Sequence, residues 1–314
     1  MLGRTANGLF WMFRYLERAE NTARMLDAGL RMALTRDLIT AEDEWRSVIA
    51  TSGRQEAYDS IHKGYSGSQV WNFILRDKEN AGNVRQMMHA VRTNARMVRT
   101  AISSEVWEAV NTSWMEIDAM LARPVGQASV GQVVRAIRGA GSLVRGAVAG
   151  SMLRDDGYCF AQAGTFIERA DKTARILDIK YFLLLPSPSY VGTKLDTGQW
   201  EQILRSVAGE RVFTWLNSWQ IDARSIVEFL VLDDRFPRSL IYCHSALRDH
   251  LTLLARIYGG EGKSHELMRD ADEQIAGLNA EKIFDEGLHE FLTGFMARNA
   301  AIADAIAEDY RFLA

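Results

Sequence analysis

Acidic and arginine side chains with the spacing of one helix face occur twice in this chain of 314 residues. The members of the first set are separated by three, four and three residues, so they share one face of a helix. The second set repeats the same steps 151 positions later. We call the two sets the acid–arginine stripes: Glu17, Glu20, Arg24 and Asp27 in the first, and Glu168, Asp171, Arg175 and Asp178 in the second.

Three kinds of chemistry fit these stripes. On facing helices, carboxylates and guanidinium groups form ion pairs that fix the register of the helices. In an open groove, the arginines would hold a ligand carboxylate or phosphate, and the acids would supply acid or base groups. Carboxylates also chelate metals in bundles, but such sites use Glu-x-x-His, and here the third residue after each leading glutamate is acidic. We therefore expect no metal and leave the first two alternatives open; burial of the stripes separates them.

Known catalytic motifs are absent from the rest of the sequence. It contains no His-Glu-x-x-His, no Gly-x-Ser-x-Gly and no phosphate-binding glycine loop. Cys243 and His244 are sequence neighbours, and neighbours point in different directions on a helix. We predict no catalytic residues and no cofactor, although an enzyme without a recognised motif stays open as the alternative.

The stripes belong to an internal repeat that covers both halves of the chain. Residues 16–27 and 167–178 are identical at eight of twelve positions, and residues 83–92 resemble 239–248 more weakly at an offset of 156. We read the halves as about 1–153 and 154–314. Within them, Arg18 and Arg169 follow the leading glutamates and are expected to point away from the stripes.

The predicted fold is all-α, a multi-helix bundle of two pseudo-symmetric repeats in a single domain without significant β-sheet. The chain has only four prolines, and apolar residues recur at steps of three and four around both motifs. These patterns predict motif helices over 5–34 and 156–185, lying against each other around a pseudo-two-fold axis. Five glycines within 129–153 predict helix breaks or close helix packing, and the Pro- and Gly-rich segment 186–198 predicts a linker.

Composition narrows the class of protein. A net charge of −3 argues against a general nucleic-acid binder, and no apolar segment is long enough to span a membrane. Two cysteines do not make a disulfide framework. We expect a soluble cytoplasmic protein. Trp215 and Trp219, one helical turn apart, are candidates for a partner-binding surface.

At the duplicated Glu-Arg motif the chain resembles the bacterial alpha-E family of all-helical proteins. The resemblance spans nearly the whole chain. It rests on Met1-Leu2-x-Arg4-Thr5-Ala6, Trp11-Met12-x-Arg14-Tyr15-Leu16-Glu17-Arg18-Ala19-Glu20-Asn21, Asn94-Ala95-Arg96, Ser103-x-Glu105-x-Trp107-Glu108 with Asn111, Phe166-Ile167-Glu168-Arg169-Ala170-Asp171, and Phe236-Pro237-Arg238-Ser239.

The resemblance implies a place in a peptide synthesis or processing system. Genes of the family neighbour those for an ATP-grasp protein and a transglutaminase-like cysteine peptidase, and no catalytic residues are established for it. We expect a non-enzymatic scaffold or partner-binding subunit that binds these proteins. A peptide and a second copy of the chain, in a homo-oligomer, are further candidate partners. The alternative is an enzyme or ligand-binding protein in amide or peptide chemistry. For either role the candidate residues are Glu17, Arg18, Glu20, Arg24, Asp27, Glu168, Arg169, Asp171, Arg175 and Asp178.

Overall fold

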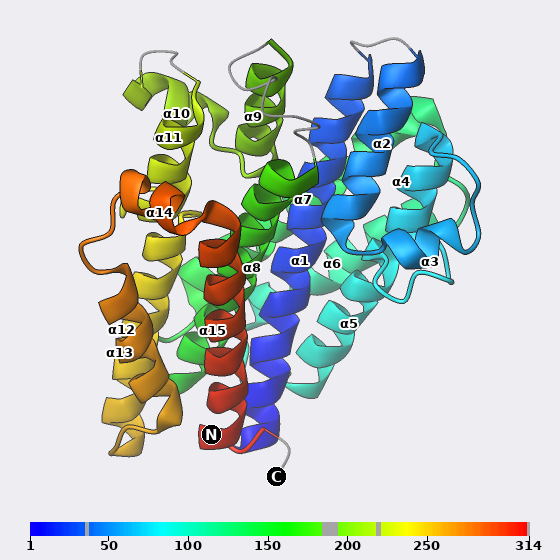
Figure 1. Cartoon of the computed structure of the whole chain (residues 1–314). Helices are drawn as coiled ribbons and strands as arrows, with labels where there is room; N and C mark the ends of the chain where they lie inside the picture. Colours follow the sequence, from blue (N-terminus) through cyan, green and yellow to red (C-terminus); the bar gives the residue numbers. More distant parts are fainter. Residues whose placement is uncertain (35–37, 184–193, 218–220, 313–314) are drawn as a thin grey trace.

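The computed structural model describes residues 1–34, 38–183, 194–217 and 221–312, and within these ranges it contains helices and turns but no strand (Figure 1). The predicted all-α class is confirmed. The helices are α1 (Gly3–Leu34), α2 (Leu38–Ser52), α3 (Gln55–Asp59), α4 (Gly67–Arg76), α5 (Val84–Met97), α6 (Ser104–Leu121), α7 (Gln127–Ser151), α8 (Asp156–Leu183), α9 (Lys194–Ser206), α10 (Glu210–Asn217), α11 (Ala223–Val227), the π-helix η2 (Glu228–Leu232), α12 (Leu240–Tyr258), α13 (Lys263–Ile275), α14 (Ala280–Glu286) and α15 (Leu288–Asp309).

The long helices form two rings of four. In the first half α1 packs on α5, α5 on α6, α6 on α7, and α7 returns to α1. In the second half α8, α12, α13 and α15 close a ring in the same order. The rings are joined by the contact between α1 and α8, which lie side by side at the centre of the molecule (Figure 1). Along the chain, the shorter helices α2–α4 lie between α1 and α5, and α9–α11 with η2 lie between α8 and α12, so both halves place short helices between the first and second helix of their ring.

The two motif helices run in the same direction. The amino group of Met1 lies 2.6 Å from the Asp156 carboxylate, so the two N-terminal ends meet. Further along, the pairs of residues that touch keep nearly the same separation in sequence, as Arg18 and Glu168 do. This arrangement aligns the repeated motifs side by side. Both helices end close to the predicted positions, and residues 184–185 lie outside the described part of the chain.

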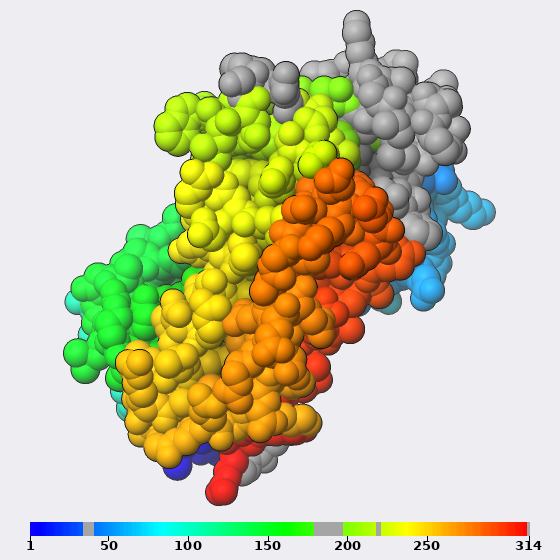
Figure 2. Space-filling view, turned by 60° about the vertical axis from the view of Figure 1, so that its left-hand side comes forward, coloured from blue at the N-terminus to red at the C-terminus, as the bar shows by residue number. Residues whose placement is uncertain are grey.

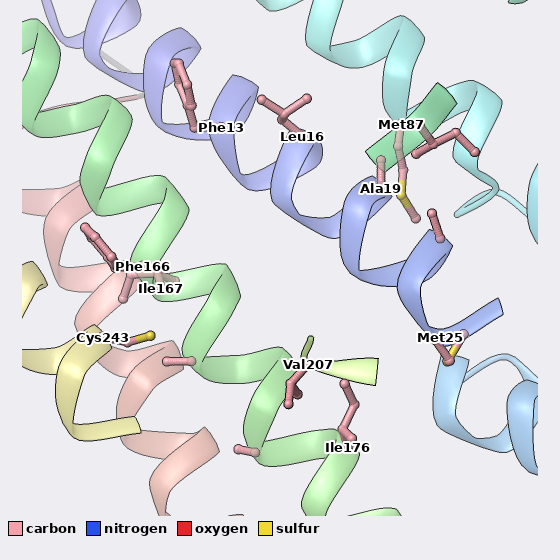
Figure 3. Packing of buried hydrophobic residues seen from close by; sticks show 14 of the residues in the cluster. Phe13, Leu16, Ala19, Met25, Met87, Phe166, Ile167, Ile176, Val207 and Cys243 are labelled. Carbon is pink, nitrogen blue, oxygen red and sulfur yellow. The ribbon is translucent and has the colours of Figure 1, made fainter. Parts of the chain in front are cut away.

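One hydrophobic core extends through both halves. It contains Phe13 and Leu16 of α1, Ile167 of α8, and residues of the flanking helices such as Met87 and Cys243 (Figure 3). These residues repeat at the three- and four-residue spacing of an amphipathic helix, so burial of that face drives the helices together. The motif helices therefore lie where the apolar cores of the two four-helix rings join.

Two glycines let neighbouring helices approach the motif helices closely. A Cβ on Gly164 of α8 would collide with the backbone carbonyl of Phe10 on α1, and a Cβ on Gly141 of α7 would collide with the Glu20 carboxylate. Helix α7 is continuous through its glycines. Of the two predictions for this segment, close packing is confirmed at Gly141, and helix breaks are wrong.

The predicted linker needs correction at its end. Residues 186–193 lie outside the described part of the chain, but residues 194–198 form the first turn of α9. Gly198 costs helix stability, yet Trp200 and Leu204 further along α9 are buried in the core. Packing of these apolar side chains outweighs the local preference. None of the described helices is both long and apolar enough to cross a membrane.

Candidate functional site

The two Glu-Arg motifs bind each other reciprocally. The Arg169 guanidinium donates from Nε and Nη2 to the two carboxylate oxygens of Glu17, at 2.9 and 3.0 Å. The Arg18 guanidinium donates in the same way to Glu168, at 2.6 and 2.7 Å. Both glutamates are 0–1% exposed. Each half thus supplies one carboxylate and one guanidinium to a pair of bidentate bonds across the α1–α8 contact, the geometry expected of helices related by a pseudo-two-fold axis.

More arginines converge on the acids of α1. Arg238, which directly precedes α12, donates to Glu17 at 2.8 Å and to Glu20 at 3.4 Å. Arg145 of α7 contacts both acids, and Arg24 donates to Glu20 at 2.5 and 3.1 Å. Two carboxylates therefore meet four guanidinium groups. We call this set the closed network: Glu17, Glu20, Arg24, Arg145, Arg169 and Arg238.

Local structure explains how the distant arginines reach α1. Ser239 caps α12 by accepting a hydrogen bond from the Tyr242 amide at 3.1 Å, which fixes the chain direction just after Arg238. Gly141 leaves room for the Glu20 carboxylate against α7, one turn before Arg145. Asn21 accepts from Arg238 at 2.7 Å and donates to Glu17 at 3.3 Å. Helices α1, α7 and α8 and the segment before α12 thus hold the closed network.

The network keeps its carboxylates ionised. Burial alone would raise the pKa of Glu17, but Arg169, Arg238 and Arg145 outweigh it and hold that pKa far below its usual range. Burial and the Glu17 charge raise the pKa of Glu20, and the arginines around it again lower it overall. Burial lowers the pKa of Arg238 to about 10. A carboxylate whose pKa lies this far below 7 binds a proton only weakly, so it is a poor acid or base for catalysis at neutral pH.

The second glutamate has fewer partners. Glu168 accepts from Arg18 and, at 3.2 Å, from Arg14. Burial raises the pKa of Glu168, but hydrogen bonding and charge from Arg18, with Lys172 and Arg14 nearby, lower it overall. Glu17 is also contacted by Arg145 of α7 and by Arg238 from the segment before α12. In their place, Glu168 is contacted by Arg14, which lies one turn before Arg18 on α1.

The remaining stripe residues do not join the closed network. Asp171 and Arg175 form an exposed pair within α8, at 2.8 and 3.0 Å. Asp27 accepts from Arg31 and from Arg138 of α7, while Asp178 pairs with His289 of α15 at 2.5 Å. The two stripes are therefore matched in sequence but not in environment.

Burial decides between the alternatives left open for the stripes. At the leading glutamates the ion-pair alternative is confirmed, and these acids do not border an open groove. The expectation that Arg18 and Arg169 point away from the stripes is wrong, since both reach the opposite helix. The side of a helix that faces its neighbour is wide enough to include residues that are adjacent in sequence. An arginine side chain is also long enough to bend toward that side.

Four residues of these clusters were missed from the sequence: Arg14, Asn21, Arg145 and Arg238. Arg14 lies one turn before Arg18 on the same face, so helical spacing points to it. Arg238 is part of the Phe-Pro-Arg-Ser segment that carries the family resemblance. For Arg145 the only signal is its position one turn after Gly141.

Other candidate chemistry has a structural explanation. Cys243 is buried, its thiol contacts the Pro237 carbonyl at 3.8 Å, and burial raises its pKa to about 12, so it is no thiolate nucleophile. Burial lowers the pKa of His244 to about 4. Within the described ranges, no group of three or more His, Cys, Asp or Glu residues is placed to hold a metal ion.

Related proteins match this sequence along nearly the whole chain. An uncharacterised protein of Mycobacterium bovis and an uncharacterised protein of Mycobacterium tuberculosis are each 25% identical to it over 331 aligned positions. The alignments cover 96% of this chain but only 36% of each relative, so the chain spans about a third of their length. No solved structure matches the chain significantly.

A family model covers residues 1–311, essentially the whole chain. That family is Alpha-E, described as a predicted alpha-helical domain with a conserved ER motif. In this structure the two Glu-Arg dipeptides are the groups that bind α1 to α8. The chain belongs to the Alpha-E family.

Proposed function

We propose that this protein is a non-enzymatic helical scaffold that binds a protein partner. The observation that carries the proposal is the closed network, because the residues most able to do chemistry are buried and used to hold the two halves together. Arginines hold the pKa values of Glu17 and Glu20 below the ordinary value, which makes both carboxylates weak proton acceptors at neutral pH. This reasoning favours the scaffold over an enzyme that uses the stripes.

Helix α10 supplies the surface on which a partner would dock. Val212, Trp215 and Leu216 share one face of this helix, and their side chains are 41%, 81% and 38% exposed. Phe213, which lies to one side of this face, is fully buried and anchors the helix. Large exposed apolar side chains on one face are typical of interaction sites. Trp219, the second tryptophan predicted for this surface, lies outside the described residues.

The surroundings of this face suggest the chemistry of the partner. A groove of about 550 Å³ begins at Leu216 and runs along α11 and η2. Its rim carries Glu228, Asp233 and Asp234, of which Asp233 already pairs with Arg235. Figure 2 shows this part of the chain, in yellow-green and yellow, at one edge of the molecule. A partner with an apolar pocket flanked by basic side chains would complement it.

The partner we propose is an ATP-grasp-like or transglutaminase-like protein of a cytoplasmic peptide synthesis or processing system. The family resemblance implies these two, and the matched relatives carry a similar domain within much longer chains. A scaffold role is consistent with these longer relatives, in which further segments are joined to the similar domain. Presentation of a peptide to such an enzyme belongs to the same proposal.

The test uses purified proteins from the same organism. The chain is mixed with the ATP-grasp-like and transglutaminase-like proteins that neighbouring genes encode. Binding is measured by calorimetry for the wild type and for Trp215→Ala. We expect one neighbour to bind the wild type and the variant to bind at least tenfold more weakly, since a tryptophan hot spot contributes 2 kcal/mol or more, roughly, at an interface.

The matched control is Leu153→Ala, which removes another exposed apolar side chain, in the turn between α7 and α8. It should bind like the wild type. If neither neighbour binds the wild type, the proposed partners are wrong. If Trp215→Ala binds as tightly as the wild type, the α10 face is not the docking surface.

A further inference from the structure

A small basic pocket lies beside the second Glu-Arg motif. It has a volume of about 100 Å³ and sits between α1, α8, the end of α2 and the segment before α5. Four cationic residues line it, and no carboxylate-bearing residue does: Arg18, Arg54, Lys172 and Arg175. We call this cavity the basic pocket.

Internal symmetry explains why the pocket is there. At the offsets of the repeat, 156 and 151, Gly82 corresponds to Arg238 and Lys172 to Asn21. The correspondence holds in space, because Asn83 and Ser239, the residues that follow, cap α5 and α12 in the same way. In the closed network Arg238 fills the space beside Asn21. Gly82 has no side chain, so the equivalent space beside Lys172 is left to the basic pocket, with the Arg54 guanidinium lying over Gly82.

Two cations of the pocket have no carboxylate of their own. The guanidinium of Arg18 is held by Glu168, and that of Arg175 by Asp171. Among the described residues, the side chains of Lys172 and Arg54 make no hydrogen bond and no ion pair of 4 Å or less. The Arg54 guanidinium lies over Gly82, with Nη2 2.7 Å from where a Cβ would stand. Burial lowers the pKa of Lys172, and the charges of Glu168 and Asp171 nearby do not offset it.

The size of the pocket limits what could supply that counter-ion. A water molecule occupies about 30 Å³ of liquid, so the cavity holds the equivalent of roughly three waters. This volume suits one phosphate group and is too small for a nucleotide. The apolar part of the wall consists of Met25, Ile74, Met87 and Ile176, of which Met25, Met87 and Ile176 are labelled in Figure 3. A charged group that enters is therefore partly desolvated, which strengthens its attraction to the cations.

We propose that the basic pocket binds a phosphate group, held by Lys172 and Arg54 and flanked by Arg18 and Arg175. Two positive charges that no carboxylate binds directly favour a dianion such as phosphate over a singly charged carboxylate. The phosphate would come from inorganic phosphate or from the end of a phosphomonoester, whose organic part would extend out of the cavity. This inference does not depend on the partner-binding function proposed above.

Calorimetric titration of the full chain with inorganic phosphate, O-phosphoserine and acetate tests the proposal. We expect saturable phosphate binding and at least tenfold weaker acetate binding. Tighter binding of O-phosphoserine than of phosphate would identify a monoester as the ligand, and weaker binding would identify free phosphate; either result supports the site. No binding of either phosphate compound, or acetate binding as tight as phosphate binding, would overturn it.

Three variants locate the binding. Lys172→Asn restores the residue found in the other half, and Gly82→Arg restores the missing arginine; each should weaken phosphate binding at least tenfold. Arg96→Ala removes an exposed cation near the far end of α5 and should leave affinity unchanged. Circular dichroism checks that each variant is folded. If Gly82→Arg does not fold, Lys172→Asn decides alone, and wild-type affinity in that variant would refute the pocket.

Discussion

Glu17 and Glu168 occupy equivalent positions in the repeat but differ in the number of cations that reach them. Arg169, Arg238 and Arg145 contact Glu17, whereas Arg18 and Arg14 contact Glu168. Both carboxylates are buried, so either one would be costly to leave unpaired. The difference lies in what surrounds each pair: one side is filled by protein, and the other leaves the basic pocket.

Removal of the Glu17 carboxylate should strongly destabilise the protein. In Glu17→Ala the buried guanidinium groups of Arg169 and Arg238 lose their main counter-charge, and breaking such a buried pair costs about 3–5 kcal/mol. Urea unfolding followed by circular dichroism measures the loss in the free energy of unfolding.

Asp171→Ala is the control for this substitution. It removes an acid of the other stripe whose partner, Arg175, has a half-exposed side chain, and such pairs contribute below about 1 kcal/mol. Equal losses in Glu17→Ala and Asp171→Ala would mean that the closed network does not stabilise the fold. A variant that stays equally stable but loses the binding of a partner or ligand would return Glu17 to the candidate site residues.

Among the elements, α7 shows how one glycine can differ from the others on the same helix. Gly141 faces the Glu20 carboxylate at a distance that leaves no room for a Cβ, while a Cβ on Gly139 would meet nothing within 4 Å. The five glycines of the segment look alike in the sequence. Their roles are separated only by which of them faces α1.

Gly141→Ala and Gly139→Ala should therefore change stability in opposite directions. Gly141→Ala pushes α7 away from Glu20 and should cost about 1–3 kcal/mol. Gly139→Ala replaces an exposed helical glycine and should stabilise the protein by up to about 1 kcal/mol, because alanine favours the helix. Thermal unfolding of both variants gives the comparison. A stabilising effect of Gly141→Ala would show that α7 does not approach α1 this closely.

Across the whole molecule, the closed network joins the two four-helix rings through buried charge. It takes residues from α1 and α7 of the first ring, from α8 of the second, and from the segment before α12. A change in these charges therefore acts on the contact that holds the halves together. The stability of the molecule should depend on pH for this reason.

Acid should destabilise the protein in two ranges. The pKa values of Glu17, Glu20 and Glu168 in the folded state lie below their ordinary value of 4.5. The contribution of these carboxylates to the free energy of unfolding is therefore complete above pH 4.5 and is lost as the pH falls further. His244 has an ordinary pKa of 6.5 and a folded pKa of about 4. The unfolded chain thus takes up a proton first, and stability falls between pH 6.5 and 4 by up to about 1.4 kcal/mol per pH unit.

His244→Phe separates these ranges. The ring of His244 stacks on Phe295 with centroids 4.5 Å apart, so a phenylalanine preserves an aromatic contact. Urea unfolding at a series of pH values should give a flatter profile between pH 6.5 and 4 for the variant, and the same loss below pH 4.5. An unchanged slope in the upper range would exclude His244 as its cause.

The sequence by itself determined the helical class, the two motif helices to within two residues at their N-terminal ends, and the repeat that relates the halves. Helical spacing is a local property, and it reports the face on which each residue lies. It was therefore enough to group Glu17 with Glu20, and to match Asn83 with Ser239, which cap equivalent helices.

Only the tertiary structure decided which charges meet. Arg238 and Arg145 reach Glu17 from elements 221 and 128 residues away, and no spacing within one helix indicates such partners. The same holds for the basic pocket, whose cause is a missing side chain at Gly82 next to a cation on another helix. Long-range partners depend on how closely helices pack, which periodicity along one helix does not contain.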